Sequence, residues 1–278
     1  MNKNLNGKRV LVTGAGTGIG KETALEFARA GAHVALHYSH TGQSVHSTVE
    51  EIRRMGCKAE AFKADFNDLK QVNILGKESI QYLGGIDCLV NNAGITFNRP
   101  FLSVTQEQFD VVYNVNIRAP FFLTQVIVEN MLSHGGGTIC NIASIHGFTG
   151  APEHSVYAGT KGAIIAYTRS LAVELAHKGI RVNAIAPGWV TVENYYTTIP
   201  GFNDKDAEKE AFEKVPLGRS GSKSEIAKLA VFLCSEDSGY IVGQTIIADG
   251  GTTSLMSLMS DFRKQSTATF GKGYVPGV

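Results

Sequence analysis

The sequence lacks several features that mark specialised protein classes. Its 278 residues include only four cysteines, and 26 lysine and arginine residues nearly balance 25 aspartate and glutamate residues, for a formal charge of +1. A balanced charge gives no basic field for a nucleic-acid backbone or an anionic membrane. Residues 1–8 contain no apolar run typical of a secretion signal, and no stretch approaches the ~18 apolar residues of a membrane span. We therefore expect a cytoplasmic protein without a nucleic-acid or membrane partner.

Metal sites and disulfides are also not indicated. The cysteines lie at least 31 residues apart, and none belongs to a C-x-x-C pair. His33 and His37 lie four residues apart on an expected strand, which separates them by ~13 Å, too far to share a ligand sphere. We interpret the cysteines as reduced packing residues and expect no metal. By contrast, the chain has 31 glycines, and these direct attention to turns where the backbone approaches a ligand.

Seven short runs rich in valine and isoleucine recur along the chain, with helical patterns between them. Strands that alternate with helices predict a parallel sheet covered on both faces. We therefore expect an α/β fold with a doubly wound, parallel, seven-stranded sheet of the Rossmann type in a single domain. The expected strands are residues 9–13, 33–38, 59–64, 87–91, 138–143, 181–186 and 245–248.

Two segments depart from this alternation. Residues 1–254 form the expected catalytic domain, and within it residues 191–219 are polar and follow the sixth expected strand. Loops at that position of a doubly wound fold cover the ligand crevice, so we expect a mobile substrate lid. Residues 255–278 form a C-terminal tail without clear periodicity, either disordered or docked on another subunit.

A glycine-rich turn follows the first expected strand directly. Residues 13–20 read T-G-A-G-T-G-I-G, and a helical pattern comes next. Glycines at positions 14, 18 and 20 permit a tight turn with backbone N–H groups facing an anion, and the helix start adds a favourable partial charge. The segment therefore predicts a site for the pyrophosphate of a dinucleotide cofactor.

The residues after the second expected strand bear on the choice of coenzyme. A carboxylate here would bind the adenosine ribose and repel a 2′-phosphate. The sequence instead has Tyr38, Ser39, His40 and Thr41. The missing carboxylate favours NADP, whereas the missing arginine leaves NAD open.

Tyr157 and Lys161 are candidates for proton transfer. Their spacing of four places both on one helix face. A phenol with a pKa of about 10 is a poor base at neutral pH, but a nearby ammonium lowers the pKa toward the working range. Ser144 follows the fifth expected strand, at the carboxyl edge of the sheet, within reach of the same substrate oxygen. The tyrosine and lysine spacing alone also fits an ordinary solvated helix start.

Taken together, these motifs resemble the short-chain dehydrogenase/reductase family in its classical form, in particular its sugar or polyol dehydrogenases and its 3-oxoacyl reductases. The resemblance covers about residues 7–252. It is carried by T-G-x-x-x-G-x-G at 13–20, Asp65, N-N-A-G at 91–94, Asn116, Ser144, Y-x-x-x-K at 157–161, P-G at 187–188, G-Q at 243–244 and D-G-G at 249–251.

The resemblance implies a role for each of four catalytic residues. Tyr157 would be the general acid/base, and Ser144 would orient and polarise the reacting oxygen. Lys161 would bind the nicotinamide-ribose hydroxyls and lower the pKa of the tyrosine. Asn116 would hold a water that links the lysine to solvent, although the position taken alone fits a polar residue satisfied inside a helix better.

The resemblance also implies a cofactor site. Asp65 would contact the adenine, Asn92 and Gly94 would line the ribose side, and the backbone at Gly188 and Val190 would meet the carboxamide. The full expected set is Gly14, Thr17, Gly18, Ile19, Gly20, Ser39, Asp65, Phe66, Asn92, Gly94, Tyr157, Lys161, Gly188 and Val190.

The chain departs from the family pattern at two places. The family often has a threonine five residues after the proline of P-G, where this chain has Val192, with Thr191 one place away. NADP-preferring members commonly carry a basic residue in the glycine turn or after the second strand, where this chain has Thr17 and Ser39. The local cofactor geometry and the coenzyme therefore stay open.

The expected substrate residues are Ser144, His146, His154, Trp189 and Asn194, with Glu153, Glu193, Tyr195 and Tyr196 nearby. Several of these bind hydroxyl groups, and a site built to pair an OH rejects analogues lacking it. We therefore expect a sugar, sugar acid or polyol. The alternatives are a 3-oxoacyl thioester of an acyl carrier protein, a steroid or other apolar carbonyl, and a dinucleotide-binding sensor without catalysis.

The resemblance further implies a homotetramer or homodimer. Such assemblies would join through long helices at about residues 105–131 and 154–176. Five apolar residues fit that face or the domain core equally well, namely Phe121, Phe122, Ile164, Ile165 and Leu171.

Overall fold

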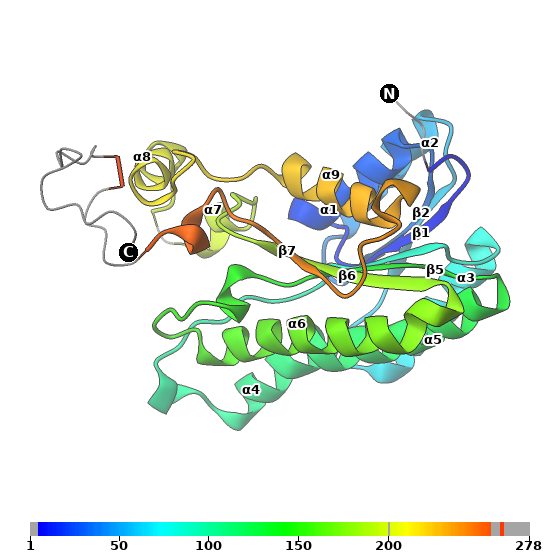
Figure 1. The fold of residues 1–278 in the computed structure, drawn as a ribbon, viewed down its shortest axis with the longest axis horizontal. Coiled ribbons are helices and arrows are strands. Elements are labelled where there is room, and N and C mark those ends of the chain that lie inside the picture. Colours follow the sequence, from blue (N-terminus) through cyan, green and yellow to red (C-terminus); the bar gives the residue numbers. More distant parts are fainter. Residues whose placement is uncertain (1–4, 200, 257–261, 264–278) are drawn as a thin grey trace, which may run out of the picture.

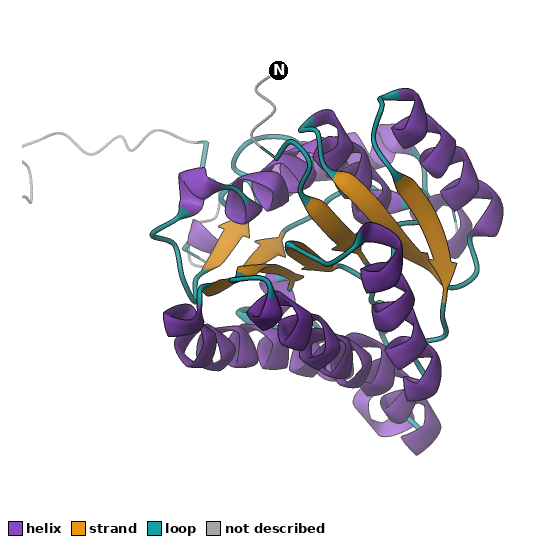
Figure 2. Cartoon of the chain, turned by 90° about the vertical axis from the view of Figure 1, so that its right-hand side faces the viewer, coloured by secondary structure: helices purple, strands orange, loops and turns teal. Residues whose placement is uncertain are grey.

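The fold is built on one parallel sheet of seven strands. The computed structural model describes residues 5–199, 201–256 and 262–263, so most of the expected tail at 255–278 lies outside the described residues. The strands run in the order β3-β2-β1-β4-β5-β6-β7 (Figures 1 and 2). They are β1 (Arg9–Val12), β2 (His33–Tyr38), β3 (Ala59–Lys63), β4 (Cys88–Asn91), β5 (Gly137–Ile142), β6 (Ile180–Pro187) and β7 (Thr245–Ala248). The expected doubly wound fold is confirmed.

Helices cover both faces of this sheet (Figure 1). One layer contains α1 (Gly18–Arg29), α2 (Gly42–Arg54) and α9 (Lys223–Cys234), and the other contains α3 (Leu69–Leu83), α4 (Gln106–Tyr113), α5 (Ala119–Ser133) and α6 (Ser155–Leu175). Apolar side chains on the two faces form separate clusters, with Phe27 and Leu36 in one and Leu89 and Leu123 in the other. Burial on both faces explains why the strands are continuous apolar runs rather than alternating ones.

The strand order fixes where a ligand can bind. The chain moves outward from β1 through β2 to β3, then returns to β4 on the other side of β1, with Val10 paired to both Val34 and Cys88. Loops leaving the carboxyl ends of β1 and β4 therefore diverge and leave a crevice between them. Within the expected lid, α7 (Tyr195–Thr198) and α8 (Asp204–Lys214) lie at this same end of the molecule (Figure 1). The movement of that lid stays a prediction.

Within the described residues, the helical run Gln106–Ser133 is the one helix long and apolar enough to cross a membrane by length and composition alone. Its mean hydropathy is 1.3. The expectation that no stretch approaches such a span is therefore too strict. Burial accounts for part of this composition, because Leu123, Ile127 and Met131 pack into the core between the sheet and α3.

The structure shows which of the apolar residues on the two long helices belong to the domain core and which are exposed. Ile164 and Ile165 are buried in a small core cluster beneath β5 and β6. Phe121 and Phe122 on α5 are instead 43% and 41% exposed. Their exposure leaves an aromatic face on the outside of this helix layer.

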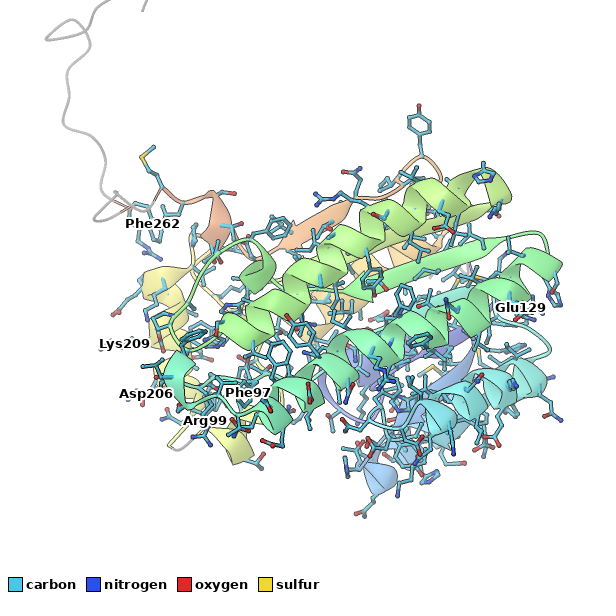
Figure 3. The ribbon with its side chains drawn as sticks, turned by 90° about the horizontal axis from the view of Figure 1, so that it is seen from below. Phe97, Arg99, Glu129, Asp206, Lys209 and Phe262 are labelled. Carbon is cyan, nitrogen blue, oxygen red and sulfur yellow. The ribbon has the colours of Figure 1, made fainter. Side chains whose placement is uncertain are left out.

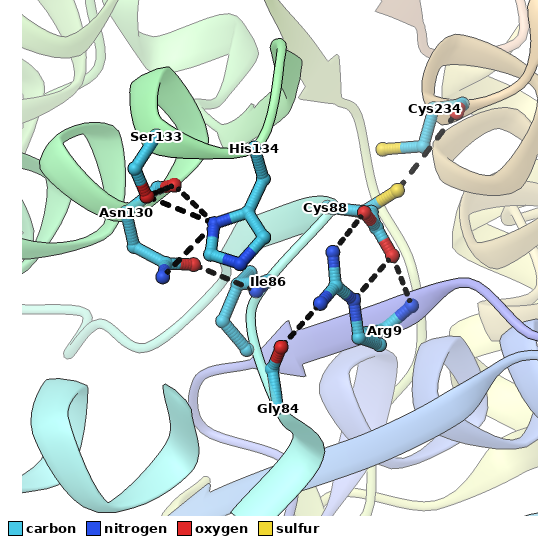
Figure 4. Close-up of polar contacts among 9 residues, drawn as sticks. Arg9, Gly84, Ile86, Cys88, Asn130, Ser133, His134 and Cys234 are labelled. Atoms are coloured by element: carbon cyan, nitrogen blue, oxygen red, sulfur yellow. Dashed lines mark hydrogen bonds and ion pairs between the residues drawn. The ribbon is translucent and has the colours of Figure 1, made fainter. Parts of the chain in front are cut away.

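Arg9 begins β1 at the amino-terminal edge of the sheet (Figure 4). It pairs with Asp87, the residue before β4. The guanidinium donates from Nε to Oδ2 at 2.9 Å and from Nη2 to Oδ1 at 2.7 Å, and the Arg9 backbone N–H also donates to Oδ2. Burial alone would raise the pKa of Asp87, but hydrogen bonds and charge from Arg9 outweigh it and lower that pKa. In the same view the Cys88 thiol donates to the Cys234 carbonyl, and no disulfide joins the cysteines within the described part of the chain.

Replacing Asp87 with asparagine is expected to destabilise the fold by about 1–3 kcal/mol at pH 7, because a half-buried guanidinium loses its charged partner. Urea unfolding measures this. The pKa of Asp87 is depressed in the folded state, so its contribution is present above the unfolded pKa and is lost as pH falls through the folded value. The matched control is Glu50→Gln, which breaks an exposed pair with Arg53 and is expected to cost about 0–0.5 kcal/mol. Equal losses in the two variants would contradict this prediction.

Candidate active site

A cleft opens at the carboxyl ends of β1, β2, β4, β5 and β6. Its walls come from the glycine turn, the end of β2, the N-N-A-G segment, the start of α6 and the beginning of the lid. Figure 3 shows Phe97 and Arg99 on the segment after β4, and Asp206 and Lys209 on α8, at this end of the molecule. The cleft therefore gathers, at one sheet edge, segments that are far apart in the sequence.

The glycine turn joins β1 to α1 and presents its backbone to the cleft. Thr17 is extended at the helix start, and Gly18 has φ +60°. Gly14 has φ +64°, and a Cβ built there would lie 2.8 Å from Cα of Ala93. Only glycine therefore allows the turn to pack this closely on the segment that follows β4.

Side chains from β1 and β4 lock this turn in place. The Thr13 hydroxyl accepts the backbone N–H groups of Asn92 and Ala93, each at 3.0 Å. The Asn92 side-chain amide donates to the carbonyls of Thr13 and Gly14 at 2.9 and 3.1 Å. Asn92, expected at the ribose side, lines the cleft and also clamps the glycine turn with its side chain.

His37 is a further support of the turn that the motifs did not indicate. Its Nδ1 accepts the N–H of Gly14 at 3.1 Å, and its Nε2 lies 3.1 Å from the carbonyl of Ala64. These partners require a neutral ring protonated on Nε2, because Nδ1 must accept. Burial lowers the pKa of His37 to about 4, so the ring stays neutral at physiological pH. A polar residue in the middle of an apolar strand was the signal available in the sequence.

The end of β2 lines the cleft with Tyr38, Ser39, His40 and Thr41. Phe66, expected at the cofactor, is buried and stacks on the His37 ring at 4.2 Å, so it lies behind the cleft wall. Asp65 is exposed outside the lining residues, and its carboxylate accepts the backbone N–H of Asn67 at 2.9 Å. The lining at this corner therefore consists of hydroxyl groups and the imidazole of His40, without a carboxylate.

Tyr157 and Lys161 lie one turn apart at the start of α6 and both line the cleft. The Lys161 ammonium donates to the carbonyl of Ile142 at 2.8 Å and lies 5.6 Å from the centre of the Tyr157 ring. Burial lowers the pKa of Lys161 to about 8. Burial also raises the pKa of Tyr157, and hydroxyls of Ser144 and Thr96 only partly offset this rise. Burial thus opposes the lowering of the phenol pKa that the sequence suggested.

Ser144 follows β5 and lies at the carboxyl edge of the sheet, as expected. Its hydroxyl lines the cleft and accepts the N–H of His146 at 3.2 Å. His146 and His154 stack in parallel at 4.6 Å, and their ring centres lie 5.7 and 6.4 Å from that of Tyr157. The two imidazoles therefore flank the tyrosine, although neither belongs to the residues that line the cleft.

Asn116 lies in a π-helical turn, Asn114–Arg118, between α4 and α5. Such turns are frequent at functional sites because they redirect side chains within a helix. Its side-chain amide donates to the Ile95 carbonyl and the Thr160 hydroxyl, and its Oδ1 accepts the Ile95 N–H at 2.8 Å. Both amide hydrogens are thus used inside the protein, where they fasten the segment after β4 to α6.

The lid segment begins beside the glycine turn. Gly188 and Val190 line the cleft, as do Val192 and Asn194, whereas Trp189 lies outside the lining. A Cβ on Gly188 would lie 2.6 Å from Cβ of Asp249, so the close approach of β6 to the segment after β7 requires this glycine. The Glu193 carboxylate reaches the turn and accepts the N–H of Gly18 at 3.0 Å.

The structure brings most of the expected site into one cleft. The expected residues that line it are Gly14, Thr17, Gly18, Ile19, Ser39, Asn92, Gly94, Ser144, Tyr157, Lys161, Gly188, Val190 and Asn194. Those outside the lining are Gly20, Asp65, Phe66, Asn116, His146, His154 and Trp189. Across the part of the chain that the structure describes, histidine, cysteine and acidic residues form no group of three that would hold a metal.

Comparisons with known proteins agree with this geometry. Residues 14–253 match the sequence model of a family described as enoyl-(acyl carrier protein) reductase. A hydroxynaphthalene reductase-like protein, Arp2, from Metarhizium anisopliae is 38% identical, and the alignment covers 90% of this chain and 96% of the relative. The 3-oxoacyl-[acyl-carrier-protein] reductase FabG from Thermotoga maritima is 37% identical, over 89% of this chain and 98% of that protein.

A solved structure is similar over the same range. It is a protein from Beutenbergia cavernae assigned as an NAD(P)-dependent gluconate 5-dehydrogenase and crystallised with bound NADP. It is 36% identical, with a TM-score of 0.84, and the match covers 92% of this chain and 100% of that chain. The relatives thus share fold and length with this chain while their names point to different carbonyl substrates.

Proposed function

The chain belongs to the short-chain dehydrogenase/reductase family of NAD(P)-dependent oxidoreductases, and from this premise we propose that it interconverts a secondary alcohol and a carbonyl with Tyr157 as the general acid/base. The observation that carries the proposal is the shared cleft. Ser144 from the end of β5 and Tyr157 with Lys161 from α6 face the same space as the glycine turn.

The residues of the glycine turn fit a dinucleotide. N–H groups at the start of α1 favour a pyrophosphate, and the close packing at Gly14 leaves the backbone at the cleft surface. We propose that the turn binds the pyrophosphate, while Gly94, Gly188 and Val190 line the nicotinamide side. When bound, the nicotinamide supplies or accepts the hydride. The remaining chemistry is proton transfer, which the protein itself must provide.

Tyr157 and Ser144 act on the substrate oxygen. In reduction the Tyr157 phenol donates its proton to the oxygen of the carbonyl as the alcohol forms, and in oxidation the phenolate takes that proton back. The Ser144 hydroxyl donates a hydrogen bond to the same oxygen and holds it in place. Lys161 stabilises the phenolate by its charge and would bind the ribose hydroxyls. Asn116 positions Tyr157 and Lys161 through its hydrogen bond to Thr160, which lies next to Lys161 on α6.

The directions of the pKa shifts of Tyr157 and Lys161 indicate that both groups are mainly protonated at neutral pH. Burial raises the pKa of Tyr157, so the phenol keeps its proton at pH 7. Lys161, with a pKa of about 8, is mostly charged at that pH. The site at rest is therefore ready to reduce a carbonyl, and alcohol oxidation requires a higher pH to remove the tyrosine proton.

We propose NADP as the preferred coenzyme. Ser39 and Thr41 line the corner at the end of β2, and Asp65, the nearest expected carboxylate, points into a local turn outside the lining. A 2′-phosphate therefore meets hydroxyls and His40 rather than an anion. No arginine lines this corner in the described part of the chain, so discrimination against NAD is expected to be small.

The proposed substrate is a sugar, sugar acid or polyol. Hydroxyl and amide groups of Thr96, Ser144, Asn194 and Tyr195 line the reacting end of the cleft. Such groups pair with substrate hydroxyls and would be left unpaired by an apolar ligand. The similarity to a gluconate 5-dehydrogenase supports the same class.

The second candidate is a 3-oxoacyl thioester, favoured by the similarity to FabG. An acidic carrier protein needs a basic surface beside the cleft. The α8 helix at this end of the molecule instead carries five acidic and three basic residues between Asp204 and Lys214. The net negative charge of α8 would repel an acidic carrier protein, which argues for a small free substrate.

We further propose that the chain forms a homodimer or homotetramer. The exposed Phe121 and Phe122 on α5 provide an apolar face of the kind that assembly buries.

The substrate is tested by following nicotinamide absorbance with NADP and with NAD. The panel contains sugars, sugar acids and polyols in the oxidising direction, and sugar ketones, a short 3-oxoacyl thioester and an aromatic ketone in the reducing direction. We expect turnover on a polyhydroxylated compound, and a lower KM for NADP than for NAD. Turnover on the thioester or the aromatic ketone alone would overturn the substrate class but keep the reaction. No turnover together with dinucleotide binding would favour a sensor.

A further inference from the structure

Glu193 of the lid segment contacts the anion-binding end of the glycine turn. Helix α1 has its first intrahelical bond from the Lys21 N–H to the Thr17 carbonyl, so the N–H groups of Gly18, Ile19 and Gly20 have no partner inside the helix. The Glu193 carboxylate accepts one of them, from Gly18, at 3.0 Å, although the two residues are 175 positions apart. A carboxylate here has the charge and the acceptor oxygens of a phosphate.

A lysine fixes the same carboxylate from the other side. Lys223, the first residue of α9, forms an ion pair and a hydrogen bond with Glu193 Oε1, while Oε2 accepts from Gly18. Burial would raise the pKa of Glu193, but Lys223 and the backbone donors outweigh it and lower that pKa. The group is therefore an anion throughout the physiological range.

We infer, on the basis of the proposed dinucleotide binding, that Glu193 is a displaceable internal ligand of the glycine turn that competes with the cofactor pyrophosphate for the Gly18 N–H. One N–H does not serve two anions, and a carboxylate beside a pyrophosphate adds like-charge repulsion. Entry of the dinucleotide therefore requires the Glu193 carboxylate to leave the Gly18 N–H.

The surroundings of Glu193 allow such a movement at little cost in packing. Its side chain is 51% exposed, so the carboxylate can turn into solvent while Val192, which packs against the core, stays in place. The segment just before it is fixed, because Val190 bridges to Gly221 and the Gly221 N–H donates to the Trp189 carbonyl at 2.8 Å. The carboxylate can therefore leave the turn by rotation of its side chain, without a movement of this backbone.

The experiment compares dinucleotide binding by the full chain and by two variants, using isothermal titration calorimetry with NADP and with inorganic pyrophosphate. Glu193→Gln keeps the shape but halves the strength of the bond to Gly18, and Glu193→Ala removes it. We expect NADP to bind ~3- to 10-fold more tightly to Glu193→Gln and tighter still to Glu193→Ala, because an internal competitor reduces the fraction of competent protein. Pyrophosphate should follow the same order.

The matched control is Glu22→Gln on α1. It removes the same charge one helical turn beyond Gly18, but Glu22 pairs with Arg29 and does not contact the turn. We expect its NADP affinity to stay within about twofold of the parent chain. An equal gain in this control would mean that overall charge, not the Gly18 contact, sets the affinity, and would overturn the inference.

The outcomes separate this inference from the proposed function. If the parent chain does not bind NADP or NAD, the proposed function fails. If it binds and the Glu193 variants bind equally or more weakly, the proposed function stands and the competition is wrong. Thermal unfolding of both variants without ligand shows whether a loss of affinity comes from misfolding.

Discussion

Replacing Tyr157 with phenylalanine is expected to lower kcat by ~10³-fold or more on whichever substrate the chain turns over, because the hydroxyl is the group that gives and takes the proton. The ring itself is retained, so its contacts with His146 and His154 persist. Dinucleotide affinity should change by no more than about twofold, since the glycine turn lies elsewhere in the cleft. Steady-state kinetics together with calorimetric titration of NADP measure both quantities.

The control for this variant is Tyr167→Phe, on the same helix. The Tyr167 hydroxyl is buried, and the Tyr167 side chain packs against a small core cluster instead of lining the cleft. Its loss is expected to leave kcat within about threefold of the parent. A Tyr157→Phe protein with nearly full turnover would exclude the proposed acid/base, and unchanged physiological function without turnover would favour a sensor.

The pH profile of the parent chain checks the same assignment. Because burial raises the pKa of Tyr157, the phenolate fraction grows about tenfold per pH unit through the neutral range. Alcohol oxidation should therefore rise between pH 7 and 8, below the point where Lys161 loses the charge that stabilises the phenolate, while carbonyl reduction, which needs the phenol, changes little. A fall in oxidation over that range would contradict the role of Tyr157 as base.

Residues whose effect is local were predictable from the sequence. The strands could be located because valine and isoleucine runs alternate with helical patterns, and the turn because Gly14, Gly18 and Gly20 recur at a strand-to-helix junction. Tyr157 and Lys161 share a helix face by spacing alone. These features depend on neighbours within a few positions, so chain order is enough to find them.

Features that depend on tertiary contact were not predictable in the same way. The sequence did not show that the Asp65 carboxylate bonds to Asn67 in a local turn outside the cleft lining, and its contact with the adenine stays a prediction. His37 was considered only as a metal ligand with His33 and rejected, whereas its ring holds Gly14 across 23 positions. Burial raises the pKa of Tyr157. This direction was not predictable, because the sequence shows the nearby lysine but not the loss of solvent around the phenol.

Substituting Gly14 with alanine is expected to weaken NADP binding by at least ~10-fold while leaving the chain folded. Two effects combine at this position. Gly14 has φ +64°, which costs an L-residue about 1 kcal/mol, and the added Cβ would lie 2.8 Å from Cα of Ala93 and 3.1 Å from its backbone nitrogen. Backbone atoms do not rotate away as a flexible side chain does, so the turn itself has to move. That movement displaces the N–H groups at the start of α1 from a pyrophosphate.

Gly56→Ala isolates the first effect, the backbone strain, because Gly56 has φ +84° but nothing within 4 Å of its Cβ position. Both variants carry the strain of a left-handed alanine, and each is expected to lose about 1 kcal/mol of unfolding free energy in urea. Only Gly14→Ala adds the collision with the segment after β4, which the Thr13 hydroxyl and the Asn92 amide hold against the turn. If both variants bind NADP like the parent chain, the close approach of the turn to Ala93 is not what shapes the site. If both lose affinity equally, general destabilisation explains the loss.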